Sequence, residues 1–201
     1  MFETRQILTA GVIAALLFAG AAQAQTVTQD ADSQADMTPA EALEMLVEGN
    51  ARFVSGDTHD RDYMEQVEAT AGGQWPFAVV LGCIDSRVPP ELVFDQGVGD
   101  IFAARVAGNF VNADILGSME FATAVAGSKV IVVLGHTSCG AVKGACDHVE
   151  LGNLTHTLSN IAPAIYAVGD TEGERSSKNK DYVHAVATEN VELTVQNILD
   201  R

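Results

Sequence analysis

Near its middle the chain runs Phe77-Ala78-Val79-Val80-Leu81-Gly82-Cys83-Ile84-Asp85-Ser86-Arg87. The apolar first half predicts a buried strand, and the glycine lets the backbone turn out of the sheet before the polar second half. The same pattern returns about fifty residues later, where Val130-Ile131-Val132-Val133-Leu134-Gly135 precedes His136-Thr137-Ser138-Cys139. Parallel neighbouring strands would bring both polar segments to one edge of a sheet, where ligands of such sheets gather.

Four side chains in these two segments suit a zinc ion. Cys83 and Cys139 offer thiolates, His136 offers an imidazole and Asp85 offers a carboxylate. Zn²⁺ takes sulfur and nitrogen ligands in tetrahedral geometry and tolerates a carboxylate oxygen in the fourth place. The two segments together therefore predict a zinc site at the edge of the sheet.

Length and composition limit the number of domains and the kinds of partner that the chain can have. The chain has 201 residues, of which 47% are hydrophobic, enough for one domain with a sizeable core. Its formal net charge is −16, from 27 acidic against 11 basic residues. Such a chain repels polyanions, and it has no basic stripe, so we expect no nucleic-acid partner.

Residues 1–24 have the pattern of a cleavable signal peptide. Arg5 lies near the start, an apolar run extends from Ile7 to Ala22, and Ala22-Gln23-Ala24 is a small-x-small cleavage site. The run is short for a bilayer span, which needs roughly 20 apolar residues, so we expect no stable membrane insertion after cleavage. An uncleaved anchor is the alternative. We expect a periplasmic or secreted protein, with the polar residues 25–37 as a flexible leader.

The chain has three cysteines, an odd number for an exported protein that pairs its thiols. If Cys83 and Cys139 hold zinc, Cys146 is left over, and we expect it to be an inert buried residue. A thioredoxin-like redox pair is disfavoured, because no two cysteines stand in C-x-x-C spacing.

The remaining pattern alternates helices and strands. Thr38 or Asp36 can cap a first helix with Pro39 in its first turn. Leu43, Leu46 and other side chains give this helix one apolar face. This order predicts an α/β fold, a mostly parallel central sheet flanked by helices. We expect strands at 77–82, 101–106 and 130–135, and helical segments at 61–71, 91–94, 112–126, 139–149, 154–168 and 180–199.

Several separated motifs resemble the β-class carbonic anhydrases. The first metal segment continues as Cys83-Ile84-Asp85-Ser86-Arg87-Val88-Pro89, and the second is Gly135-His136-Thr137-Ser138-Cys139-Gly140-Ala141. Further matches are Gly49-Asn50-Ala51-Arg52-Phe53-Val54, Gly99-Asp100-Ile101-Phe102 and Arg105-Val106-Ala107-Gly108-Asn109. The resemblance extends from about Ala40 to Leu199, with the motifs in the family's order and spacing, and it suggests an exported bacterial member.

The resemblance implies a zinc lyase that converts carbon dioxide and water reversibly to bicarbonate and a proton. It implies that Cys83, His136 and Cys139 hold one Zn²⁺ per subunit, with water in the fourth position activated at neutral pH. Asp85 and Arg87 would be the catalytic pair: Arg87 holds Asp85, which accepts a hydrogen bond from the nucleophile and thereby orients it. In a closed state Asp85 would instead become the fourth metal ligand.

The same resemblance implies two substrate-binding residues and an oligomer. Gln74 matches a glutamine that hydrogen-bonds the substrate, from across a dimer interface, although a solvated loop residue is the alternative. Phe102 matches an apolar pocket position, a role compatible with a place in the core. We expect a homodimer or a higher even oligomer, and the sequence does not choose between dimer and tetramer.

The chain departs from the family pattern in two ways. Val80 stands where members regulated by bicarbonate have tryptophan, which favours the subtype whose site is open at neutral pH, with Asp85 on Arg87. The family usually adds a final strand after a helix like 181–199, and no strand signal follows here. We therefore expect a carbonic anhydrase-like domain over residues 38–201 that lacks this strand, whose loss exposes a sheet edge.

Two other functions remain open. One is hydrolysis of CS₂ or COS on the same scaffold, with a narrowed entrance, and the other is an idle zinc-binding homologue. A cysteine phosphatase is rejected, because it needs an arginine six residues after its cysteine and Arg87 comes four after Cys83. A dinucleotide site is unsupported, because no G-x-G-x-x-G follows a strand.

Overall fold

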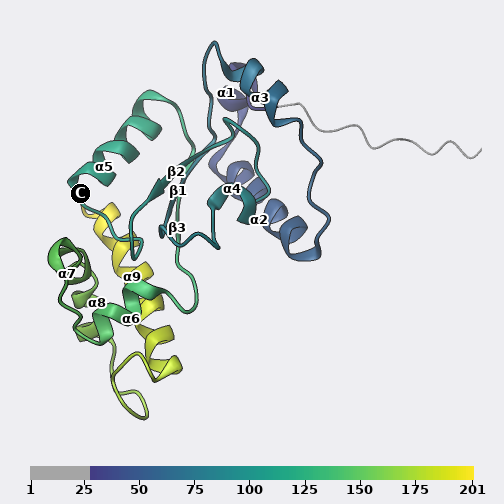
Figure 1. Cartoon of the computed structure of the whole chain (residues 1–201). Helices are drawn as coiled ribbons and strands as arrows, with labels where there is room; N and C mark the ends of the chain where they lie inside the picture. The colour runs from purple at the N-terminus through teal and green to yellow at the C-terminus, as the bar shows by residue number, and fades with distance from the viewer. Residues whose placement is uncertain (1–27) are drawn as a thin grey trace, which may run out of the picture.

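A computed structural model describes residues 28–201 (Figure 1). The predicted signal peptide and the first residues of the predicted leader lie outside this range. Beyond them the structure differs from the expected flexible leader, because α1 (Ala31–Asp36) is closed by a capping box between Asp30 and Ser33. Gln34 Nε2 also donates hydrogen bonds to the carbonyls of Pro76 and Ala126, both at 2.8 Å, which fasten α1 to the body.

Three parallel strands form the sheet, in the order β2-β1-β3. They are β1 (Ala78–Gly82), β2 (Ile101–Arg105) and β3 (Val130–Leu134). The register aligns Gly82 with Arg105 on one side and with Leu134 on the other, so the three strands end level with one another. Every residue of β1 is buried, as expected for the central strand of a parallel sheet. The predicted parallel sheet is thus confirmed.

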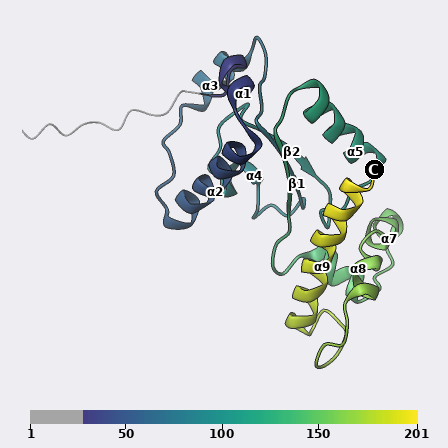
Figure 2. The same cartoon turned by 180° about the vertical axis from the view of Figure 1, so that it is seen from behind.

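Helices cover both faces of this sheet (Figures 1 and 2). On one face Leu46 of α2 (Pro39–Ser55) packs in a cluster with Val80 of β1. On the other face Met119 of α5 (Ala113–Glu120) packs with Leu81. Alternate residues of a strand point to opposite faces, so β1 supplies both clusters.

Short elements connect this framework. Thr38 and Glu41 form a capping box at the start of α2, which begins at Pro39 as predicted. The predicted helices before and after β1 are present as α3 (Tyr63–Thr70) and α4 (Pro90–Val93). The predicted helix 112–126 is α5 followed by a π-helical turn, η1 (Phe121–Val125).

A group of helices packs at the C-terminal end of the strands and contributes a third cluster, which includes Cys83 and Cys139. These are α6 (Gly140–Cys146), α7 (Gly152–Ser159), α8 (Ala162–Ala167) and α9 (Lys180–Leu199). The single helix predicted over 154–168 was wrong, because α7 ends before α8 begins. Pro163 lacks an amide hydrogen and its ring clashes with the carbonyl four residues earlier, so one helix cannot continue through it.

None of the helices within residues 28–201 is both long enough and apolar enough to cross a membrane.

Candidate metal centre

The residues that follow β1 and β3 converge as the sequence predicted. The ligand atoms of Cys83, His136 and Cys139 all lie within 4.8 Å of one another. The two sulfurs are 3.9 Å apart. Two sulfurs bound to one tetrahedral zinc ion, each at about 2.3 Å, would lie about 3.8 Å apart, so the thiol spacing fits such an ion.

His136 has the hydrogen bonding of a metal ligand. Its Nδ1 lies 3.0 Å from the carbonyl oxygen of Thr137, to which only a protonated Nδ1 can donate. In the neutral ring this leaves a lone pair on Nε2. Nε2 is buried and has no hydrogen-bond partner among residues 28–201. A buried polar atom without a partner is costly, and a metal ion at this point would remove that cost.

Local backbone geometry aims these side chains inward. Cys83 is the first residue after β1, and Cys139 is the residue that precedes the first turn of α6. Ser138, between Cys139 and Thr137, has a φ of 56°, in the left-handed region that non-glycine residues seldom adopt. The turn between β3 and α6 therefore has a strained backbone residue directly before Cys139.

The two thiols share their protons unequally. A hydrogen bond from Cys139 stabilises the Cys83 thiolate and lowers the pKa of Cys83. The same contact, together with burial, raises the pKa of Cys139. A divalent cation between the sulfurs would displace the remaining proton, because thiolates are the form that binds metal.

Asp85 and Arg87 form a bidentate ion pair beside these ligands. Arg87 Nε donates to Asp85 Oδ1 at 2.9 Å and Nη2 donates to Oδ2 at 2.7 Å. The backbone N–H of Arg87 also donates to Oδ1, at 3.0 Å. These bonds lower the pKa of Asp85 well below its usual range. Asp85 Oδ2 lies 3.9 Å from His136 Nε2, so the carboxylate stands next to the ligand set while Arg87 occupies it.

Three supporting residues that were not predicted as site residues lie around Cys83. Arg105 Nε donates to the Cys83 carbonyl at 2.8 Å, and the Gly108 N–H points at Cys83 Sγ from 3.4 Å. Asn190 of α9 is buried and donates to the Gly108 carbonyl at 2.8 Å. These contacts join residues far apart in the chain, so no local pattern predicts them. The only signal in the sequence was that Arg105 and Gly108 belong to one motif.

Comparison with known proteins agrees with this geometry. A family model described as carbonic anhydrase matches residues 78–201, which is more than half of the chain. Those residues include the whole sheet and every candidate ligand. The chain belongs to the carbonic anhydrase family. Its solved structural neighbours, given below, are of the β class.

Among curated relatives of this carbonic anhydrase family member is carbonic anhydrase 2 of Mycobacterium tuberculosis, 42% identical over 133 residues. That match covers 63% of this chain and 64% of the relative. The carbonic anhydrase of Mycolicibacterium smegmatis is 45% identical over 117 residues, covering 58% of this chain and 57% of the relative. The chain thus spans less than two thirds of the length of these relatives.

Solved structures show the same fold. The β-carbonic anhydrase CcaA superposes with a TM-score of 0.60 at 26% identity, covering 79% of this chain and 74% of CcaA. A Coccomyxa β-carbonic anhydrase in complex with acetazolamide gives a TM-score of 0.58 at 25% identity, covering 78% and 71%. The predicted β-class fold is therefore confirmed.

Within one chain of this β-carbonic anhydrase family member, the two predicted substrate residues lie away from the ligand set. Gln74 is exposed and precedes the N-terminal end of β1, whereas Cys83 follows its C-terminal end. A five-residue strand is about 16 Å long, so Gln74 does not reach the metal site of its own chain. Phe102 lines a hollow of about 710 Å³ and makes an edge contact with Phe121 of η1, at 6.3 Å between ring centroids. Neither role is tested, and both stay predictions.

Cys146 of α6 is buried, and burial raises the pKa of its thiol to about 11. It lies outside the group that could hold a metal. A separate hollow of about 330 Å³ is lined by His136 and its neighbours Gly135 and Thr137 and by residues of α9, among them His184.

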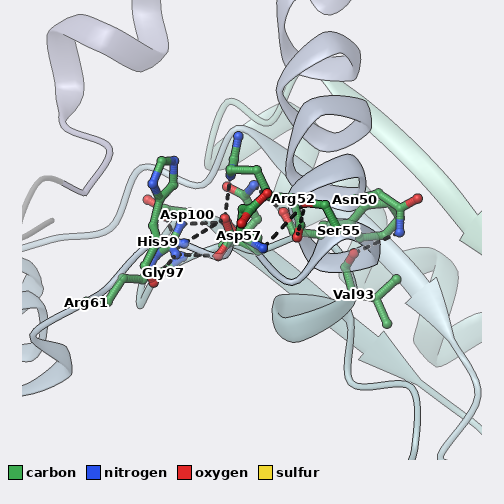
Figure 3. Close-up of polar contacts among 12 residues, drawn as sticks. Asn50, Arg52, Ser55, Asp57, His59, Arg61, Val93, Gly97 and Asp100 are labelled. Atoms are coloured by element: carbon green, nitrogen blue, oxygen red, sulfur yellow. Dashed lines mark hydrogen bonds and ion pairs between the residues drawn. The ribbon is translucent and has the colours of Figure 1, made fainter. Parts of the chain in front are cut away.

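A second charged cluster lies near the opposite end of the sheet, before β2. Asp95 is buried and pairs with both Arg52 and Arg61. Burial raises the pKa of Asp95, but hydrogen bonds from Arg52, the His59 backbone and Arg61 outweigh it and hold the pKa below its usual value. Figure 3 shows Arg52, His59 and Arg61 gathered here with Asp100, whose pKa burial raises.

Proposed function

We propose that this chain holds one zinc ion through Cys83, His136 and Cys139 and hydrates carbon dioxide reversibly to bicarbonate and a proton. The observation that carries the proposal is the buried, unpartnered His136 Nε2 facing two thiols whose sulfurs are 3.9 Å apart. Sulfur, sulfur and nitrogen ligands with one position left over are the donor set of a catalytic zinc site.

A zinc ion held by these residues would supply a hydroxide nucleophile at neutral pH, because zinc lowers the pKa of water to about 7. The protein's own part falls to Asp85 and Arg87. Because its pKa is lowered, Asp85 stays a carboxylate and can only accept hydrogen bonds. With Arg87 donating to both of its oxygens, Asp85 is fixed 3.9 Å from His136 Nε2. There it can accept a hydrogen bond from the nucleophile and thereby orient it.

Stopped-flow CO₂ hydration at about pH 7 to 8.5, on samples whose zinc content is measured, tests the proposal. The experiment compares the chain starting at Gln25 with Cys83→Ala and with Cys146→Ala as matched control, since both thiols are buried but only Cys83 lies in the ligand group. We expect zinc-dependent hydration that is lost in Cys83→Ala and retained in Cys146→Ala. A folded protein with one zinc per chain that does not hydrate CO₂ would contradict the proposal. Release of sulfide from CS₂ or COS by that sample would then favour the alternative hydrolase, and its absence the idle homologue.

Assembly and export belong to the same proposal. Two tetrameric β-carbonic anhydrases from Sordaria macrospora, one of which superposes with a TM-score of 0.59 at 25% identity over 79% of this chain and 81% of that one, show that similar folds assemble. The outer face of α2 exposes Leu43, Val47 and Val54, which an even oligomer would cover. Light scattering tests for a dimer or tetramer. Amino-terminal sequencing of periplasmic material tests cleavage after Ala24.

A further inference from the structure

Arg105, the last residue of β2, reaches across to the segment that follows β1. Its Nε donates to the carbonyl of Cys83 at 2.8 Å, and its Nη2 donates to the carbonyl of Asp85 at 2.6 Å. A single planar guanidinium therefore holds the backbone of a proposed zinc ligand and the backbone of the neighbouring carboxylate residue.

The register of the sheet explains why this side chain stands there. Gly82 is the last residue of β1, it aligns with Arg105, and its carbonyl accepts from the Val106 N–H at 3.1 Å. After Gly82 the chain leaves the sheet, so the carbonyls of Cys83 and Asp85 have no strand neighbour. The guanidinium of Arg105 presents donors in a fixed fork and meets both carbonyls at once.

Asp85 is thus held from two sides. Arg87 holds its carboxylate, but the side chain of Arg87 is 65% exposed, and an exposed ion pair contributes little against competition from water. Arg105 is partly buried and holds the Asp85 backbone to that of Cys83. The position of the carboxylate relative to the ligand set therefore depends on Arg105 as well as on Arg87.

We infer that Arg105 is a positioning residue that keeps the Asp85 carboxylate on Arg87 and away from the metal. The inference rests on the proposed function and deepens it, because it names the side chain that keeps the fourth metal position free. Without Arg105, the segment from Cys83 to Asp85 can shift, and the carboxylate can take the fourth position itself.

Arg175 provides a matched control. Its guanidinium also donates to main-chain carbonyls, those of Ile165, Val168 and Gly169 near the end of α8, and it lies over the ring of Tyr182 at 4.8 Å. None of these carbonyls belongs to the ligand group or to Asp85. Replacing Arg175 removes the same kind of contact without touching the metal centre.

The experiment compares Arg105→Lys, Arg105→Gln and Arg175→Gln with the unmodified chain. Azide is titrated into the cobalt(II)-substituted proteins, whose visible spectrum reports a ligand in the fourth position, and kcat and KM for CO₂ are measured on the zinc proteins. For both Arg105 variants we expect azide affinity and kcat to fall about 10- to 100-fold, the usual cost of losing a support of a metal site. Arg105→Lys keeps the charge but replaces the fixed fork of two donor nitrogens with a single ammonium nitrogen. Arg175→Gln should change only thermal stability.

Unchanged azide affinity in Arg105→Lys, or an equal loss in Arg175→Gln, would overturn the inference. If Arg105→Gln fails to fold, the milder Arg105→Lys still decides. If the unmodified zinc protein does not hydrate CO₂, the proposed function fails, but the azide titration on the cobalt proteins still tests the positioning role.

Discussion

Charged and polar side chains gather at both ends of the sheet, but only at one end are the buried polar groups paired within the chain. Near the N-terminal end of β2, the Asp95 carboxylate is buried and fully engaged by Arg52 and Arg61. At the C-terminal ends of β1 and β3, His136 Nε2 is buried and has no hydrogen-bond partner in the described chain. At one end the polar groups are paired within the chain, whereas the donor atoms at the other end are those that a metal ion would bind.

This difference separates stability from function. A closed set of charges serves the fold, because every member is satisfied within the chain. Buried donor atoms without a partner destabilise the folded state. Metal binding to them raises the free energy of unfolding, because the metal binds the folded state only. We therefore expect substitutions at the two ends to affect different measurements.

The largest effect should follow from removing a ligand. Cys139→Ser should lose zinc and with it CO₂ hydration, because a hydroxyl is a much poorer zinc ligand than a thiolate. Chelation of zinc from the unmodified protein should lower its unfolding free energy by about 4 kcal/mol if zinc was present at a thousand times its dissociation constant. Zinc analysis and thermal unfolding with and without chelator measure both. Tight zinc binding by Cys139→Ser would show that the Cys139 thiolate is not a required ligand.

The next effect lies at the opposite end of the sheet. Asp95→Asn preserves the backbone, since asparagine tolerates the φ of 46° found there, but leaves two arginines without their carboxylate. Removing one partner of a buried ion pair costs about 3–5 kcal/mol, and we expect the lower end because Arg52 is partly exposed. Urea unfolding measures the loss, and zinc content should stay at one per chain. A variant as stable as the parent would show that this cluster does not support the fold.

Asp85→Asn should change catalysis and leave the metal in place. An amide offers one acceptor oxygen where the carboxylate offers two, and it holds no negative charge, so the bidentate pair with Arg87 and the orienting acceptor are lost. We expect kcat to fall about 10- to 100-fold with bound zinc unchanged. Stopped-flow hydration on samples of known zinc content measures it. Simultaneous loss of zinc would mean that Asp85 supports metal binding instead.

The smallest effect is in the pH dependence of stability. The pKa of Asp95 is lowered on folding, so its contribution is complete above its unfolded value of about 3.9 and is lost as the pH falls through the folded value. Unfolding free energies measured by urea between pH 3 and 6 should therefore fall less on acidification in Asp95→Asn than in the parent. Asp100 has the opposite sign: its raised pKa makes its contribution largest at low pH and smaller as the pH rises through the folded value. Equal acid slopes in parent and Asp95→Asn would contradict this account.

Much of the fold and the ligand set could be predicted because their signals are local. An apolar run closed by glycine marks each of two strands, and Cys83 and His136 stand directly beyond them. The break between α7 and α8 was also local, since it falls at Pro163, but the helical pattern on both sides concealed it.

The rest depends on contacts between distant residues. Gln34 of α1 bonds to Pro76 and Ala126, and no pattern within residues 25–37 could indicate those partners. Likewise Asn190 reaches Gly108 from α9, and Arg105 reaches Asp85 from the neighbouring strand. Such supports become visible only when the register of the strands and the packing of the helices are known.

X-ray absorption at the zinc edge, on the zinc-loaded chain, would test directly whether Cys83, His136 and Cys139 hold the metal. We expect two sulfur ligands at about 2.3 Å and two lighter ligands at about 2.0–2.1 Å in the unmodified chain, the same shell in Cys146→Ala, and loss of this shell together with the bound zinc in Cys83→Ala. A zinc shell with one sulfur or none, or one that is unchanged in Cys83→Ala, would contradict this assignment of the ligands.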